Sequence, residues 1–151
     1  AWFGMAEGII TNDKNAIEYG KKIIDITYPL GWDKKYGGII AFTDLNKRPA
    51  VQLEADMKLW WPQCETLIAC YMAYKQFGDK KYLNIYNKLL KYVKKYFIDK
   101  KSGEWYGYLH YNNTPSTTLK GNIFKGPFHV PRFYMIMSVL ESGLSILDYI
   151  G

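Results

Sequence analysis

The sequence of 151 residues lacks most features of membrane, metal-binding and disulfide-stabilised proteins. Its two cysteines, Cys64 and Cys70, lie in an apolar helical run, and neither has metal-ligand spacing to another cysteine or to a histidine. We therefore expect free thiols in a reducing compartment and no metal site. No apolar run is long enough to span a bilayer, and residues 1–13 lack the basic segment and cleavage site of a signal peptide. We expect a soluble, cytoplasmic protein with no membrane partner.

Motifs for phosphate binding and nucleophilic catalysis are also missing. The sequence has no Gly-rich phosphate loop and no serine nucleophile elbow, and it contains two histidines. Any chemistry must therefore be acid/base chemistry.

Positive charge exceeds negative charge, and the net charge is +6. Much of it comes from lysines between residues 80 and 101, which alternate with leucines and other apolar residues as on the solvent face of an amphipathic helix. No base-reading motif accompanies these lysines, so we expect no nucleic-acid partner. Aromatic residues make up 17% of the chain, more than a core of this size needs, and surplus rings often line a ligand site.

A repeat runs along the chain at an offset of 66 residues. Asp33-Lys34-Lys35-x-Gly37 falls on Asp99-Lys100-Lys101-x-Gly103. Each copy has a helical pattern before it, a short alternating stretch after it and a second helical pattern beyond. The predicted helices are 15–28, 62–77, 81–97 and 130–149, and the predicted strands are 38–43 and 104–111.

The repeating unit predicts an all-α fold of helical hairpins with short β-excursions. Such hairpins bury their apolar faces by stacking on their neighbours, so we expect an arc of a ring. The apolar residues from Trp2 to Ile10 have no capping residue before them, and we expect the chain to begin inside a helix of a larger domain. At the same offset Gln63 falls on His129. Equivalent positions in a ring point to the same place, which predicts a site near its centre.

Two helix starts carry candidate site residues. Trp60, Trp61, Gln63 and Glu65 cluster at the first, where one tryptophan should pack and the other face a cavity. Glu65 is either a site residue or an acid that stabilises the positive end of its helix.

His129 is at the second helix start, with Arg132 three residues later. The positive helix end disfavours a proton on an imidazole and stabilises an anionic intermediate, as a general base at neutral pH requires. From the residues alone, His129 is either such a base or a structural histidine.

Three segments resemble a known family. They are QLEADMKLWWPQCETLIA (52–69), SGEWYGYL (102–109) and LKGNIFKGPFHVPR (119–132). In this order and spacing they resemble the N-acylglucosamine 2-epimerases, also described as renin-binding proteins.

The resemblance implies an (α/α)6 barrel, of which residues 1–151 would be the C-terminal portion with the N-terminal half missing. It implies an isomerase that interconverts N-acetylglucosamine and N-acetylmannosamine by moving the C2 proton through an enediolate. No cofactor would be required, a nucleotide such as ATP could regulate the enzyme, and the full-length protein would be a homodimer with a small sugar as its substrate.

Site residues follow from the same resemblance. His129 and Glu65 would be catalytic, and we expect Trp61, Gln63, Lys125 and Arg132 to bind the substrate. The second histidine base of the family belongs to a Gly-His-x-x-Glu block that would directly precede Ala1. The 151 residues alone are therefore expected to be inactive.

Alternatives stay open at this point. Gln63 stands where many N-acylglucosamine epimerases have a further histidine and cellobiose 2-epimerases have glutamine. A cellobiose 2-epimerase or an aldose–ketose isomerase of the same superfamily would use the same chemistry. A non-catalytic helical interaction module is the alternative outside enzymology.

Overall fold

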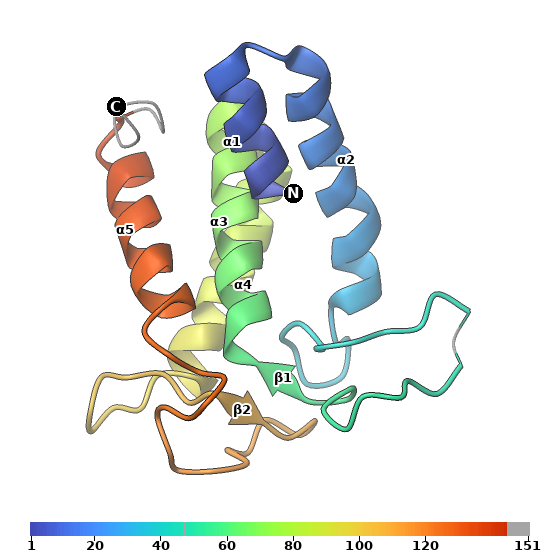
Figure 1. The fold of residues 1–151 in the computed structure, drawn as a ribbon, viewed down its shortest axis with the longest axis vertical. Coiled ribbons are helices and arrows are strands. Elements are labelled where there is room, and N and C mark those ends of the chain that lie inside the picture. The colour runs from blue at the N-terminus through green and yellow to red at the C-terminus, as the bar shows by residue number, and fades with distance from the viewer. Residues whose placement is uncertain (47, 145–151) are drawn as a thin grey trace.

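The computed structural model describes residues 1–46 and 48–144. Within them the chain forms helical hairpins, with two short strands in the connecting loops (Figure 1). The order is α1 (Trp2–Thr11), α2 (Lys14–Gly31), β1 (Lys58–Leu59), α3 (Trp60–Phe77), α4 (Lys80–Tyr96), β2 (Tyr108–Leu109) and α5 (His129–Glu141). Helices α1, α3 and α5 run in one direction, and α2 and α4 return antiparallel to them (Figure 1). The all-α prediction is confirmed.

The tight turns at one end of the molecule repeat at the predicted offset. Asn12 after α1 and Gly78 after α3 both adopt the left-handed conformation, with φ of 56° and 69°. The next residue is an aspartate in each case, and its carboxylate caps the following helix. Asp13 accepts from the amide of Asn15 at 2.8 Å, and Asp79 accepts from that of Lys81 at 2.8 Å.

The Asp-Lys-Lys-x-Gly motif forms the same turn after α2 and after α4. The Gly37 amide donates to the Asp33 carbonyl at 3.0 Å, and the Gly103 amide donates to the Asp99 carbonyl at 2.7 Å. Both glycines have positive φ, 78° and 75°, which explains why the motif ends in glycine. The sequence repeat is thus a repeat of structure.

The predicted strands are shorter than expected. Within residues 38–43, all of which the structure describes, Ile39 forms one isolated bridge to Trp32. Within residues 104–111, β2 is preceded by a bridge from Trp105 to Ile98. The alternating pattern was misleading because these segments border turns and loops, which leave them no long partner strand.

Strand β1 was not predicted, since two residues carry no recognisable alternation. It pairs antiparallel with β2, with Lys58 opposite Leu109 and Leu59 opposite Tyr108. The pair joins the two loops that connect the hairpins, and β1 leads directly into α3. It therefore helps to fix where α3 begins.

Helix ends differ slightly from prediction. Helix α2 continues through Pro29 to Gly31, three residues beyond its predicted end at residue 28. Pro62 and Pro131 each occupy the third position of their helix, close to the first-turn positions that tolerate proline. Helix α5 ends at Glu141, and the part of its predicted range beyond residue 144 lies outside the described residues.

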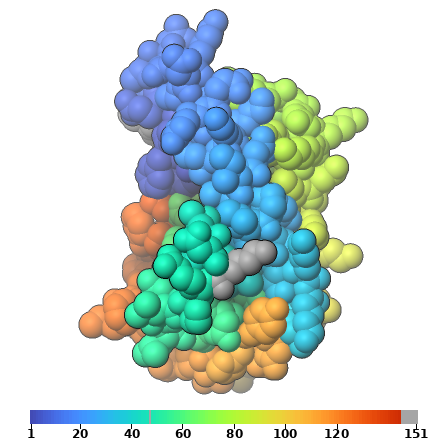
Figure 2. Space-filling view, turned by 90° about the vertical axis from the view of Figure 1, so that its right-hand side faces the viewer, coloured from blue at the N-terminus to red at the C-terminus, as the bar shows by residue number. Residues whose placement is uncertain are grey.

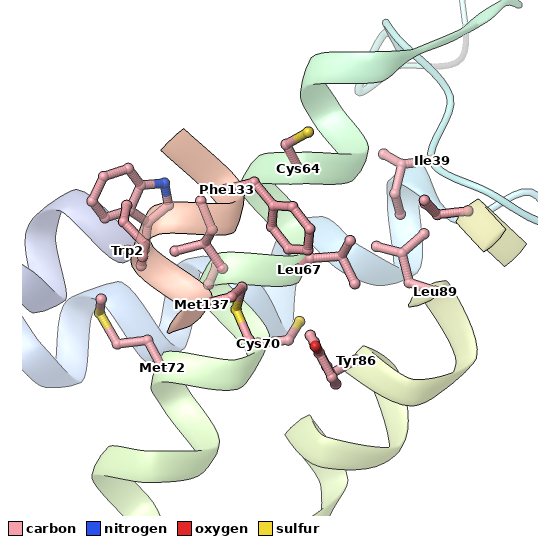
Figure 3. Packing of buried hydrophobic residues seen from close by; sticks show 14 of the residues in the cluster. Trp2, Ile39, Cys64, Leu67, Cys70, Met72, Tyr86, Leu89, Phe133 and Met137 are labelled. Carbon is pink, nitrogen blue, oxygen red and sulfur yellow. The ribbon is translucent and has the colours of Figure 1, made fainter. Parts of the chain in front are cut away.

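Helix α3 is at the centre of the core, with α1, α4 and α5 packed around it (Figure 3). Its side chains Leu67, Ile68 and Cys70 have no solvent exposure, and Phe133 of α5 packs in the same cluster. Burial of one such aliphatic side chain contributes roughly 1.5–3 kcal/mol. This packing holds the starts of α3 and α5 in fixed relative positions.

Two further predictions about the core and surface are confirmed. Cys64 and Cys70 are buried free thiols, and burial raises the pKa of Cys70 to about 12, which keeps it protonated. Helix α4 is amphipathic, with Tyr82, Leu89 and Val93 buried and most of its lysines exposed. No helix among the described residues is long and apolar enough to cross a membrane.

Candidate functional site

Three parallel helices bring polar side chains together near their N-terminal ends. Trp2 is the first residue of α1, Glu65 is in the second turn of α3, and His129 and Arg132 are in the first turn of α5. The loops of the molecule gather beside this end of α3 and α5 (Figures 1 and 2). We call Trp2, Glu65, His129 and Arg132 the Glu65 cluster.

Glu65 is the hub of this cluster. Its Oε1 accepts from His129 Nδ1 at 2.8 Å and from Arg132 Nη2, and its Oε2 accepts from Trp2 Nε1 at 2.6 Å. Burial raises the pKa of Glu65, but these hydrogen bonds and the charge of Arg132 outweigh it and hold the pKa below its usual range. Glu65 is therefore an ionised carboxylate at neutral pH.

The ionised Glu65 fixes the tautomer of His129. A carboxylate can only accept, so His129 Nδ1 must carry the proton that is donated to it. Arg132 Nη2 is also 3.2 Å from Nδ1, which follows because both nitrogens converge on the same carboxylate oxygen. With Nδ1 protonated, the lone pair of a neutral imidazole is on Nε2. This is the arrangement of a general base whose ring is oriented by an acid.

Aromatic rings surround His129. The ring centroids of Phe128, Trp61 and Trp60 lie 5.0, 6.1 and 6.2 Å from that of the imidazole. Trp60 is buried and packs in the core, whereas Trp61 is partly exposed, as expected for the pair. The side chain of His129 is 26% exposed to solvent, so a small molecule can reach it. A partly open tryptophan beside a base is a suitable stacking surface for a sugar.

Arg132 is held by rings as well as by Glu65. Its guanidinium carbon is 4.2 Å from the ring centroid of Phe128 and 5.3 and 5.4 Å from those of Trp2 and Phe3. Cation–π contacts of this kind fix the planar guanidinium beside the carboxylate. Its Nε is buried without a hydrogen-bond partner among the described residues.

Gln63, expected to bind the substrate, lies outside this cluster and makes its hydrogen bonds to backbone groups. Its side chain is fully buried. The amide nitrogen donates to the carbonyls of Ile39 at 2.9 Å and Leu59 at 3.0 Å, while Oε1 accepts from the Ile39 amide at 2.9 Å. Both donor hydrogens are used by backbone groups. Gln63 thus fastens the loop after α2 to the start of α3, a role invisible in a helix-start pattern.

A second residue expected to bind the substrate is Lys125. Its side chain is 6% exposed, and its ammonium donates to the Glu104 carboxylate at 3.2 Å and the Lys120 carbonyl at 2.6 Å. Its aliphatic part lies against Gly107. Lys125 therefore closes the loop before α5 through its contacts with Glu104 and Lys120.

A buried lysine that sequence reasoning missed stabilises the start of α3. Lys58 is fully buried, and its ammonium donates to Asp33 Oδ2 at 2.6 Å, Asn113 Oδ1 at 3.1 Å and the Tyr111 carbonyl. Tyr92 also donates to Asn113 Oδ1, at 2.7 Å. Burial raises the pKa of Asp33, but the hydrogen bond from Lys58 and those from nearby backbone amides bring it below its usual range.

The cluster around Lys58 joins segments that are far apart in the sequence. Asp33 follows α2, Tyr92 is in α4, and Asn113 follows β2. Lys58 itself is two residues before α3, so the cluster anchors the helix that carries Glu65 and both tryptophans.

An open groove of about 520 Å³ lies between α1, α2 and α3. Glu65 and Trp2 reach one end of it, but its walls are mainly aliphatic, with Ile23, Ile24 and Leu30 among them. His129 and Trp61 are not among the residues that line it. Among the described residues, no group of three His, Cys, Asp or Glu side chains is placed to hold a metal ion.

Comparison with known proteins identifies the family. The model of the N-acylglucosamine 2-epimerase (GlcNAc 2-epimerase) family matches residues 2–128. The chain belongs to this family. It is 41% identical over 132 residues to the N-acylglucosamine 2-epimerase of Mus musculus, which covers 87% of this chain and 32% of the mouse protein.

Two proteins with other names are more distant. The chain is 34% identical over 92 residues to a cellobiose 2-epimerase of Ruminococcus albus, covering 59% of this chain and 23% of that protein. A crystal structure of a D-mannose isomerase superimposes with a TM-score of 0.81 at 23% identity, covering 90% of this chain and 34% of that one. The chain therefore folds as an arc of an (α/α)6 barrel, and it spans between about a quarter and a third of the length of these proteins.

Proposed function

We propose that this chain is the C-terminal part of a single-domain sugar 2-epimerase that interconverts N-acetylglucosamine and N-acetylmannosamine. The observation that carries the proposal is the Glu65 cluster, in which an ionised carboxylate holds His129 with a proton on Nδ1 and a lone pair on Nε2. A base in this state can remove a proton from carbon next to a carbonyl.

The reaction follows from this geometry. His129 Nε2 takes the C2 proton of the open-chain sugar, the electrons of the C2–H bond form a C1–C2 double bond, and C1=O becomes the oxyanion of an enolate that keeps the N-acetylamino group on C2. The imidazolium that results is stabilised by the charge of Glu65, and Arg132, whose Nη2 is 3.2 Å from His129 Nδ1, is a cation that can stabilise the developing negative charge. Return of a proton to the other face of C2 gives the epimer.

The second face needs a second base. We propose that it comes from the Gly-His-x-x-Glu block that the family resemblance places before Ala1, in the other half of the barrel. Residues 1–151 alone would then hold one base and an open pocket. We therefore propose that they are inactive without the rest of the barrel.

The identity of the sugar is supported by sequence similarity. The chain is more similar to the mouse N-acylglucosamine 2-epimerase than to the Ruminococcus cellobiose 2-epimerase, both in identity and in the share of the chain that aligns. Gln63 is weaker support for a cellobiose 2-epimerase than its position in the sequence suggested, because both of its amide hydrogens bind backbone carbonyls. An N-acyl amino sugar is therefore the proposed substrate.

Incubation of the whole protein with single sugars tests the proposal. N-Acetylmannosamine, N-acetylglucosamine, cellobiose and mannose are supplied separately, and products are followed by ¹H NMR. We expect conversion of the two N-acetyl sugars into each other at the highest kcat/KM. Cellobiose converted to its 2-epimer, or mannose to a ketose, at a higher kcat/KM would assign one of the alternative substrates, and no conversion at all would contradict the enzyme proposal.

The remaining features of the proposal rest on family resemblance. We propose a cytoplasmic homodimer that needs no cofactor and that a nucleotide such as ATP regulates. Sedimentation of the whole protein tests the dimer. Activity after exhaustive dialysis against chelator tests whether a cofactor is needed, and the same assay with and without ATP tests regulation by the nucleotide.

A further inference from the structure

The indole of Trp2 makes a contact that the proposed reaction has not yet used. Trp2 Nε1 donates to Glu65 Oε2 at 2.6 Å, which is short for an N–H···O hydrogen bond. His129 and Arg132 both bind the other oxygen, Oε1. The carboxylate is thus held at both of its oxygens, from α1 on one side and from α5 on the other.

Packing fixes the direction of the indole N–H. Trp2 is 7% exposed and belongs to the main core cluster, and its ring stacks on Phe3 with centroids 3.9 Å apart. Helix α1 itself lies close to α2 at Gly20, where an added Cβ would be 2.5 Å from Met5 and 2.7 Å from the Ala1 carbonyl. Figure 3 shows Trp2 among the side chains of the buried cluster. The start of α1 therefore has little freedom, and Trp2 cannot turn away from Glu65 without disturbing the core.

The chemistry of indole suits this position. An indole N–H donates and never accepts, and it carries no charge, so it stabilises the ionised Glu65 without competing for the proton of His129. A second cation in its place would lower the negative charge that the imidazolium needs. A side chain without a donor would leave the Glu65 carboxylate free to rotate. The hydrogen bond from His129 Nδ1, which selects the tautomer, would then no longer be held in place.

We infer that Trp2 is a positioning residue of this site: its N–H holds the Glu65 carboxylate in the orientation that keeps the proton of His129 on Nδ1. The inference rests on the proposed function for its effect on catalysis. The contact and its effect on the tautomer can be measured without any substrate.

Trp2→Phe in the whole protein tests the inference, since phenylalanine keeps a ring and removes the N–H. We expect kcat for N-acetylmannosamine to fall about 10-fold or more, because a hydrogen bond to a charged group is lost from the machinery that orients the base. KM should change less than threefold. The acid limb of the kcat/KM profile should move to higher pH, because an ionised Glu65 loses one of its stabilising donors.

Met5→Leu is the matched control. Met5 is fully buried in the same helix, and its thioether has no hydrogen to donate to Glu65, so this variant disturbs the packing of α1 and leaves the hydrogen bond from Trp2 in place. Its kcat and pH profile should stay near those of the wild type. Equal losses in Trp2→Phe and Met5→Leu, or a Trp2→Phe profile that superimposes on the wild-type one, would overturn the inference.

A second measurement separates this inference from the proposed function. The ¹⁵N shifts of the His129 ring should report a proton on Nδ1 in the wild type and a mixture of tautomers in Trp2→Phe. The indole proton of Trp2 should resonate downfield and move as Glu65 titrates. A wild type that converts no sugar would contradict the proposed function, whereas unchanged His129 shifts in Trp2→Phe would contradict the positioning role whatever the activity.

Discussion

Replacing Lys58 by methionine should destabilise the protein strongly. Methionine is similar in length and apolar, so it fits the buried space but leaves Asp33 without its partner. Asp33 is 3% exposed, so its carboxylate would remain buried. The rings of Tyr36 and Tyr111, which lie beside the Lys58 ammonium, offer it no replacement charge. Breaking a buried ion pair by removing one partner costs about 3–5 kcal/mol. Asn113 Oδ1 and the Tyr111 carbonyl also lose a donor, which adds to the cost.

The double variant Asp33→Asn/Lys58→Met provides the internal comparison. It removes both charges, so no uncompensated charge is left buried. We expect it to recover more than half of the loss. Lys91→Met, on the exposed face of α4, serves as the surface control and should stay within about 0.5 kcal/mol of the wild type.

Urea unfolding followed by circular dichroism measures all three variants in the whole protein. A Lys58→Met variant within about 1 kcal/mol of the surface control would show that the Asp33–Lys58 pair is not an anchor of α3. A double variant no more stable than the single one would show that the loss comes from packing rather than from an uncompensated charge.

Three further outcomes follow from the same structure. Gly38→Ala should lower the unfolding free energy by about 2 kcal/mol or more in urea titrations, because φ is 82° and the new Cβ would lie 2.4 Å from the Tyr92 ring; wild-type stability would contradict the tight contact. Gln63→Leu should cost about 1–3 kcal/mol by leaving the buried Ile39 amide and carbonyl unpaired, with little change in KM; a large rise in KM at unchanged stability would restore a substrate role. The contribution of Asp33 to the unfolding free energy should be complete above about pH 4 and be lost as the pH drops through its depressed pKa. Lys58→Met should weaken this acid dependence in unfolding titrations, and an unchanged dependence would assign it to other carboxylates.

Local patterns in the sequence predicted most of the fold. The 66-residue repeat, the amphipathic α4 and the aspartate-glycine turns depend on residues close together in the chain, and all are found as expected. Strand β1 could not be predicted, because it exists through pairing with β2, about fifty residues away along the chain.

The site was predictable in part for the same reason. His129 as the first residue of α5, and a buried and a partly open tryptophan at the start of α3, follow from local sequence. The partner of a polar side chain does not. The family resemblance led us to expect Gln63 and Lys125 at the substrate, but in the structure each donates to backbone carbonyls. Trp2 was missed because Glu65 is 63 residues away from it.

The central claim is that His129, oriented by Glu65, moves the C2 proton of an amino sugar. The most direct test compares the whole wild-type protein with its His129→Asn variant, with N-acetylmannosamine in D2O and ¹H NMR detection. The wild type should form N-acetylglucosamine with deuterium at C2. The variant should remain folded by circular dichroism and lose about 100- to 10,000-fold in the rate of epimerisation. A variant rate within threefold of the wild type, or a loss fully explained by unfolding, would contradict the claim.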